Sequence, residues 1–317
     1  MNEQIENSLR FYENHVAELI HQAFSPYEHR IAVGLVGEGA DCFGFDDFIS
    51  RDHDFGTGVC LWIRDEDMAL FGHDLDDAYN DLIDRMPGNH LTTRLRERRG
   101  VMTISDFYSK ILGIPCDTTI LQLTDEQWRN LDHSCLATAT NGAVFRDDAG
   151  AFTAYRKMLL DYYPDRIWRI RIINEIHKFS AALQVNYARC MSRQDEVAAR
   201  LCQIHGLEAA MQLFFLMKRT YPPYYKWTYR KLQELDGNGF FSKWVKELSQ
   251  AQPDAGAWEG KAYRPQYLNL SDRIVVLAER LAEELVKMLQ SHGLISGSDP
   301  YLENHIDELM QGISHNP

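Results

Sequence analysis

The sequence predicts an α+β protein, with a mixed sheet and flanking helices first and a helical bundle after it. Short apolar runs bounded by glycine or polar residues, as buried strands have, nearly vanish after residue 150. From Phe152 onward, long apolar patterns at helical spacing replace them. We therefore expect an α/β domain over residues 1–150 and a helical bundle over residues 151–317.

The first elements follow from apolar spacing. Residues 3–24 place large apolar side chains three and four positions apart, which predicts a helix, and Pro26 ends it. Two apolar runs follow, 31–36 and 59–63, and each has the length of a buried strand. Because they flank one glycine-rich and acidic stretch, we expect them to be neighbouring strands.

The rest of the first half alternates helices and strands. An acidic helix is expected over 74–85, with its carboxylates forming a solvated face, and a strand over 99–104. Ser105 is expected to cap a short helix over 106–112. Thr124 opens a capping box and a helix through about Ala137.

The second half shows helical periodicity almost throughout. The most linker-like segment, residues 249–256, lies within it and contains Pro, Asp and Gly. The expected helices cover residues 152–162, 165–193, 195–219 and 272–292.

Composition limits the cellular setting. The 317 residues are 45% hydrophobic, enough for one large domain or two modest ones. The six cysteines include no C-x-x-C pair, so we expect reduced, structural thiols. No window approaches eighteen apolar residues, and the first residues lack a basic region followed by an apolar core. We therefore expect a cytoplasmic protein that does not cross a membrane.

The formal net charge of −13 limits the partners. Polyanions bind through clustered Lys and Arg, and an acidic surface repels them at long range. General nucleic-acid binding is therefore disfavoured. A free nucleotide on Mg²⁺ stays compatible with this charge, and so does a local basic cleft for one RNA end.

The stretch from Gly39 to Asp54 carries the strongest functional signal. Gly39 and Ala40 follow the first apolar run, and eleven residues later come Asp52, His53 and Asp54. On an extended segment the two carboxylates, at i and i+2, point the same way and can share one hard divalent cation. The His53 side chain then points to the other side. A glycine turn upstream exposes backbone N–H groups to a phosphate.

This stretch resembles the polymerase-β-like nucleotidyltransferase superfamily, whose pattern is Gly-Gly or Gly-Ser, nine to thirteen residues, then Asp-x-Asp or Asp-x-Glu. More narrowly, the chain resembles the bacterial proteins grouped as DUF4037. The matching residues are Gly39, Cys42–Asp47, Ser50–Gly56, Gly142, Val144, Phe145, Asp147, Asn186, Tyr187, Arg189 and Tyr221–Trp227.

The resemblance implies a nucleotidyltransferase-like sheet and Mg²⁺-dependent (or Mn²⁺-dependent) transfer of a nucleoside monophosphate from an NTP, with ATP as the first candidate. Asp52 and Asp54 would be the catalytic metal ligands, and the turn at Gly39 and Ala40 would hold the β- and γ-phosphates. The acceptor stays open between a small molecule, a protein and an RNA end.

Several residues depart from the superfamily pattern. Ala40 stands where a serine hydroxyl is usual, and Glu38 replaces an apolar residue. The expected third strand contains no acid, although Glu97 and Asp106 flank it. Two other interpretations therefore stay open: a nucleotide-binding regulatory protein that has lost catalysis, and a helical interaction protein such as one half of a toxin–antitoxin pair.

Two cations of the second half are candidate phosphate ligands. Arg189 shares a helical face with Lys178 and Arg193, where it would grip a triphosphate or else pair with carboxylates such as Asp195 and Glu196. Lys226 lies in the segment 221–227, whose two prolines indicate a rigid connection between helices.

Lys226 would meet a phosphate while Tyr225 or Trp227 stacks on a base; the alternative is a packed corner between helices. We expect Arg189 and Lys226 to face the Asp52–Asp54 pair, because one metal leaves most of a triphosphate's charge unneutralised.

Overall fold

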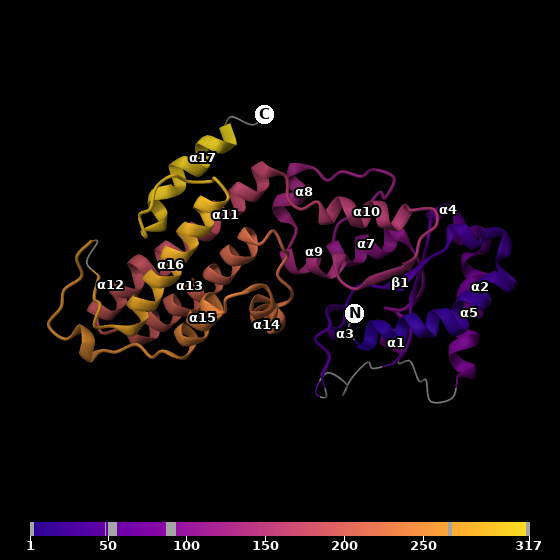
Figure 1. Ribbon diagram of the computed structural model, residues 1–317, viewed down its shortest axis with the longest axis horizontal. Coiled ribbons are helices and arrows are strands. Elements are labelled where there is room, and N and C mark those ends of the chain that lie inside the picture. Colours follow the sequence, from indigo (N-terminus) through magenta and orange to yellow (C-terminus); the bar gives the residue numbers. More distant parts are fainter. Residues whose placement is uncertain (1–2, 48, 50–55, 87–92, 266–267, 315–317) are drawn as a thin grey trace. The chain divides into compact units, whose positions relative to one another are not determined.

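The computed structural model describes residues 3–47, 49, 56–86, 93–265 and 268–314. They form two compact units, Met1–Tyr162 and Tyr163–Pro317. The first is α+β and the second is helical (Figure 1). Within these ranges, no helix has the length and apolar character needed to cross a membrane.

A small mixed sheet forms the centre of the first unit. Its strands are β1 (Ala32–Leu35), β2 (Cys60–Ile63), β3 (Gly100–Thr103) and β4 (Ala143–Arg146). The order across the described sheet is β3-β2-β1-β4. β1 runs antiparallel to β2 and to β4, whereas β2 and β3 are parallel. The two apolar runs are thus neighbouring strands, as predicted.

One face of the sheet packs on helices that precede β1 in the sequence and on a helix that follows β2. The predicted N-terminal helix is α1 (Glu3–Phe11), a π-helical turn η1 (Tyr12–Val16) and α2 (Ala17–Ala23), followed by the 3₁₀ segment η2 (Ser25–Arg30). Together with α5 (His73–Arg85), it packs on this face of β1 and β2 (Figure 1). Each of the two strands is buried along its whole length, which explains its continuous apolar run.

The other face of the sheet packs on aromatic side chains. The Trp62 ring stacks on Phe152 with 3.8 Å between centroids and meets the edge of Phe107 at 5.4 Å. Phe107 belongs to α7 (Ile104–Leu112) and Phe152 to α10 (Ala151–Leu160). We expected the domains to divide near residue 150, but α10 belongs to the first unit because Phe152 is part of this cluster.

Two predicted helix starts differ from the structure. The α7 helix begins two residues earlier than expected, because Thr103 and not Ser105 caps it and accepts the Asp106 N–H. The capping box at Thr124 is confirmed. Its helix, α8 (Asp125–Asn130), ends well before Ala137, because the Asp132 carboxylate caps a new helix, α9 (His133–Thr140).

Short elements complete the described part of the first unit. They connect the strands and the larger helices, and they are α3 (Ala40–Phe43), α4 (Asp65–Asp67), the π-helical η4 (Met68–Gly72) and α6 (Thr93–Arg96).

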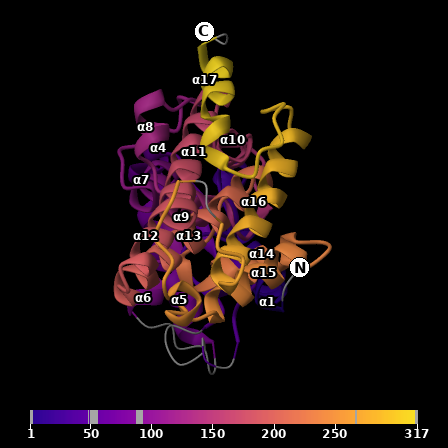
Figure 2. The ribbon, with the colours of Figure 1, turned by 90° about the vertical axis from the view of Figure 1, so that its left-hand side faces the viewer.

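The second unit packs around one long buried helix, α13 (Glu196–Met217), and its described residues contain no strand. Helices α11 (Asp165–Phe179), α15 (Phe240–Gln250) and α16 (Arg273–Ser291) contact α13 (Figures 1 and 2). The other elements are η5 (Ser180–Asn186), α12 (Tyr187–Ser192), α14 (Tyr225–Leu235), η6 (Gly256–Trp258), η7 (Leu302–His305) and α17 (Ile306–Ser314).

A buried carboxylate joins three segments of this unit. One Asp272 oxygen accepts the Tyr187 hydroxyl (2.8 Å) and the Trp258 indole N–H (2.7 Å), while the other accepts the backbone N–H of Ile274 (2.7 Å). Asp272 is fully buried, and it caps α16. These bonds fix the chain that follows the linker-like segment 249–256.

Candidate functional site

The three strands that matter most for the site meet at one edge of the sheet. The register pairs Gly34 with Cys60 and Cys60 with Gly100, so the carboxyl end of β1 lies beside the amino ends of β2 and β3. The expected phosphate turn follows β1, and residues 96–99 precede β3. This edge therefore brings together the turn and a segment rich in arginine.

The turn itself depends on two glycines. Gly37 has φ 120° and Gly39 has φ 129°, backbone conformations that residues with a Cβ atom rarely adopt. A Cβ atom on Gly39 would also overlap the Asp41 carboxylate. Ala40 opens α3, which Gly44 ends in the left-handed conformation. The backbone from Gly37 to Gly44 is thus tightly specified.

Residues about 100 positions later in the sequence of the first unit hold this turn. The Asn141 side chain accepts the Gly37 N–H (2.9 Å) and donates to the Gly37 carbonyl (2.8 Å). The Gly142 N–H donates to the Cys42 carbonyl (3.0 Å). The Arg156 guanidinium donates to the Asn141 carbonyl (3.0 Å). Asn141-Gly142 is a sequence typical of a turn, and the local sequence gives no sign of this role.

A buried arginine holds the other side of the turn. Arg99 is 3% exposed, and its guanidinium donates to the Asp41 carboxylate (2.8 Å) and the Cys42 sulfur (3.5 Å). Burial nevertheless raises the pKa of the Cys42 thiol well above its usual value, and it also raises the pKa of Cys60. Both therefore stay neutral thiols, which agrees with the structural role predicted for the cysteines.

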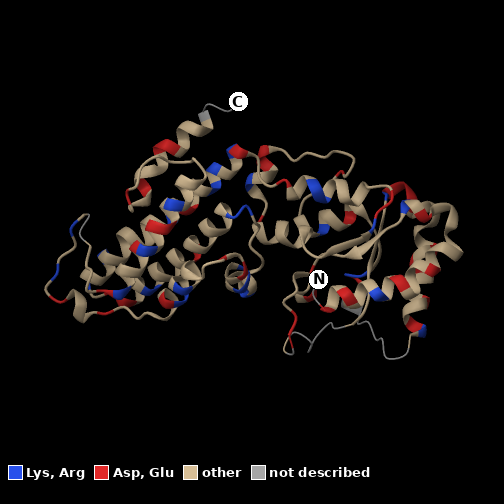
Figure 3. Ribbon diagram, viewed as in Figure 1, with Lys and Arg blue, Asp and Glu red and all other residues tan. Residues whose placement is uncertain are grey.

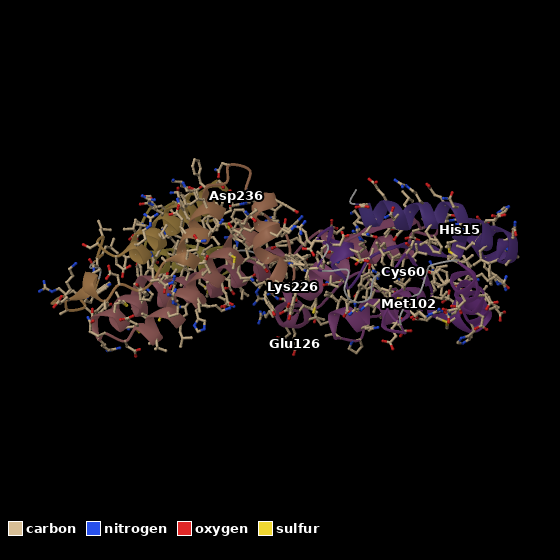
Figure 4. All side chains as sticks on the ribbon, turned by 90° about the horizontal axis from the view of Figure 1, so that it is seen from below. His15, Cys60, Met102, Glu126, Lys226 and Asp236 are labelled. Atoms are coloured by element: carbon tan, nitrogen blue, oxygen red, sulfur yellow. The ribbon has the colours of Figure 1, made fainter. Side chains whose placement is uncertain are left out.

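A pocket of about 460 Å³ opens beside the turn. Its lining includes apolar side chains of β3 and α7, among them Met102, which is labelled in Figure 4. Its charged lining residues are Arg96, Arg98, Arg99 and Lys110 on one hand, and Glu38, Asp76, Glu97 and Asp106 on the other. Equal numbers of cations and acids make this pocket far less acidic than the whole chain.

Contacts hold several of these cations in place. Arg98 pairs with Glu38 at 2.9 Å. Arg96 pairs with Asp84 and donates to the Asn80 side chain at 2.9 Å. The pocket thus presents positioned guanidinium groups next to the glycine turn.

The predicted metal pair, Asp52 and Asp54, lies outside the described residues, and so does His53. Gly39 and Ala40 lie at the sheet edge described above. Among the residues that the structure describes, no group of three or more His, Cys, Asp or Glu side chains is arranged to hold a metal ion.

Arg189 and Lys226 both lie in the second unit. Arg189 is exposed; it donates to the Asn186 side chain (3.3 Å), and its guanidinium lies 5.1 Å from the Tyr263 ring centroid. Lys178 pairs with a carboxylate, that of Glu175, at 2.6 Å, as the alternative interpretation of these cations expects. That Arg189 and Lys226 face the metal pair stays a prediction.

The connection containing the two prolines is shorter than expected. Pro222 and Pro223 are buried and lie outside any helix or strand, but α14 begins at Tyr225. Lys226 and Trp227 therefore lie in the first turn of a helix and not in the connection. The ammonium group of Lys226 lies 5.3 Å from the Trp227 ring centroid.

Comparison with known families gives one match. The profile of DUF4037, a domain of unknown function, matches residues 128–228, about a third of the chain. No curated protein and no solved structure matches the chain. The matched segment includes Asn141, Arg156, Arg189 and Lys226. This match supports a relationship to the DUF4037 family.

Proposed function

We propose that the protein is a Mg²⁺-dependent nucleotidyltransferase, which transfers a nucleoside monophosphate from an NTP, with ATP as the first candidate, to an acceptor. The observation that carries this proposal is the position of the turn. The segment Gly37–Ala40 lies where β1 ends and where β2 and β3 begin, beside a pocket with positioned arginines. A nucleotide requires this combination of a close backbone and nearby cations.

Asp52 and Asp54 are the proposed metal ligands. Paired carboxylates two residues apart are hard oxygen ligands that suit Mg²⁺. When bound, the metal supplies charge neutralisation for the phosphates. Asp54 precedes Gly58 by four residues, and Gly58 packs against Arg99. Four extended residues span at most roughly 14 Å, which is the longest stretch of chain that can separate Asp54 from Gly58.

The chain's own residues have distinct proposed roles. Backbone N–H groups of Gly39 and Ala40 would bind the β- and γ-phosphates, since Ala40 offers no hydroxyl. Asn141 and Arg99 position the turn through their hydrogen bonds to Gly37 and Asp41. An acceptor hydroxyl attacks the α-phosphorus; the bond to the β-phosphate breaks, and pyrophosphate leaves.

A second candidate is a nucleotide-binding protein that does not catalyse transfer. The absence of an acid from β3, Gly100–Thr103, favours it, because the superfamily pattern places a third carboxylate on such a strand. Glu97 and Asp106 nevertheless line the pocket on either side of β3. Either one could replace the missing carboxylate in the proposed enzyme.

The test uses each of the four NTPs labelled on the α-phosphate, with Mg²⁺ and a cell extract. The proposed enzyme transfers label to a defined acceptor, and the Asp52→Asn and Asp54→Asn variants do not. Nucleotide binding without transfer supports the second candidate instead. If the protein neither binds nor transfers a nucleotide, both candidate functions are contradicted.

A further inference from the structure

The second unit contains a long stretch without acids. Between Glu208 and Glu234 the sequence has five Lys and Arg residues and no Asp or Glu, although acids outnumber bases by 46 to 33 in the whole chain. This stretch includes the end of α13, the connection after it and most of α14 (Figure 3). The local charge is therefore opposite in sign to that of the whole protein.

Aromatic rings lie among these cations. Tyr224 is 51% exposed and Tyr225 is 76% exposed, and their ring centroids are 4.3 Å apart. Lys226 and Arg230 place their charged groups 5.3 Å and 5.7 Å from the Trp227 ring centroid. We call Tyr224, Tyr225, Lys226, Trp227 and Arg230 the α14 surface; Lys226 is labelled in Figure 4.

Other residues of the helix hold α14 on the bundle. The Thr228 hydroxyl donates to the Pro223 carbonyl (3.0 Å), and Leu232 is fully buried. The Tyr229 hydroxyl donates to the Ser242 carbonyl (3.1 Å). Docking of α14 therefore does not require the exposed ring of Tyr225, and exposed aromatic rings are common at binding sites.

We propose that the α14 surface binds the end of a single-stranded RNA. Bases stack on the exposed tyrosine rings, and phosphates lie beside Lys226 and Arg230. Proteins bind single strands through this combination of aromatic platforms and cations. Two exposed rings next to each other suit planar bases better than the side chains of an acidic peptide. The proposal rests on the proposed function, since it makes RNA the acceptor class.

The site is small, which agrees with the strongly acidic chain. Two cations and a pair of rings suit a strand end of a few nucleotides and provide no track for a long polyanion. The site also overlaps the segment that matches DUF4037, which ends at residue 228.

Binding is measured by fluorescence anisotropy with a labelled twelve-nucleotide single-stranded RNA, without NTP or Mg²⁺. The double variant Lys226→Gln/Arg230→Gln removes two phosphate contacts. The slope of log affinity against log salt should fall by about 1.4, since each contact on a single strand contributes about 0.7. The control, Lys178→Gln/Lys287→Gln, removes two exposed cations elsewhere in the same unit and should leave affinity and slope unchanged.

Tyr225 gives an independent test of stacking. Tyr225→Phe keeps the ring and should keep the affinity, whereas Tyr225→Ala should lower it at least about fivefold. Single-stranded DNA of the same sequence should bind more weakly than RNA. Equal affinity for the two would overturn the assignment to RNA. No RNA binding, or the same loss in the Lys178/Lys287 control, would overturn the α14 site.

The two proposals fail separately. Loss of NTP binding in Asp52→Asn, with RNA binding intact, tests the metal pair alone. Loss of RNA binding in the single variant Arg230→Gln, with Mg²⁺-dependent NTP binding intact, tests the acceptor surface alone.

Discussion

Replacing Asn141 by Ala tests whether the turn is positioned by the amide bridge to Gly37. The substitution removes two hydrogen bonds, 2.9 Å and 2.8 Å long, from a buried backbone unit. A buried polar group that loses its partner costs about 1–3 kcal/mol. Because Asn141 is half-buried, water can satisfy part of this loss. We therefore expect the turn to lose about 1–3 kcal/mol in total.

Hydrogen exchange of the peptide covering residues 37–44 measures this change. A loss of about 1–3 kcal/mol corresponds to exchange roughly 5- to 150-fold faster, where opening limits the rate thermodynamically. The same variant should bind NTP more weakly, since the proposed phosphate contacts move with the turn. Asn238→Ala is the control, because the Asn238 side chain accepts one exposed N–H, from Phe240 (3.0 Å), in the other unit.

Unchanged exchange over residues 37–44 in Asn141→Ala would refute this role for the amide. Faster exchange with unchanged NTP affinity would keep the structural role but remove the turn from the proposed nucleotide site. Equal acceleration in Asn238→Ala would show a general loss of stability instead.

Three further predictions concern other parts of the chain. Ala40→Ser should keep or strengthen triphosphate binding by roughly 0.5–1.5 kcal/mol, measured by calorimetry, because it adds one hydroxyl donor; clear weakening would place the cradle elsewhere. Asp272→Asn should destabilise the second unit by about 2–4 kcal/mol in urea unfolding, because Tyr187 and the indole of Trp258 lose a charged acceptor; a change below about 0.5 kcal/mol would contradict this. Burial opposes ionisation of Asp132, but the Ser134 hydroxyl and N–H outweigh it and hold the pKa of Asp132 below its usual value. The ionised Asp132 therefore stabilises the folded protein above about pH 4, and this stabilisation is lost as the pH falls through the lower pKa of Asp132 in the folded protein. Asp132→Asn should thus reduce the dependence of the melting temperature on pH at acid pH. An unchanged dependence would contradict the assigned cause.

Local signals in the sequence predicted the central elements well. The runs 31–36 and 59–63 indicated β1 and β2, because a strand buried on both faces needs apolar residues at every position. The capping box at Thr124 was also readable, since both of its hydrogen bonds join residues three apart. Such features depend on residues close together in the chain.

Contacts between residues that are far apart in the sequence could not be predicted from it. The Asn141 bridge joins residues 104 positions apart, and the Arg99–Asp41 pair joins residues 58 apart. Nothing in the local sequence shows that Asn141 is more than a turn former. Similarly, the sequence predicts α10 as the first helix of the bundle, but its Phe152 packs on Trp62 of β2. Tertiary packing decides these cases.

The most direct test of the proposed function is Mg²⁺-dependent NTP binding by Asp52→Asn and Asp54→Asn. Each substitution removes a charged ligand and keeps the side-chain shape, so affinity should fall at least roughly tenfold, about 1.4 kcal/mol. Asp74→Asn, on the exposed face of α5, is the matched control and should bind as the unchanged protein does. Unchanged Mg²⁺-dependent binding in both Asp52→Asn and Asp54→Asn, with circular dichroism showing an intact fold, would contradict the nucleotidyltransferase assignment.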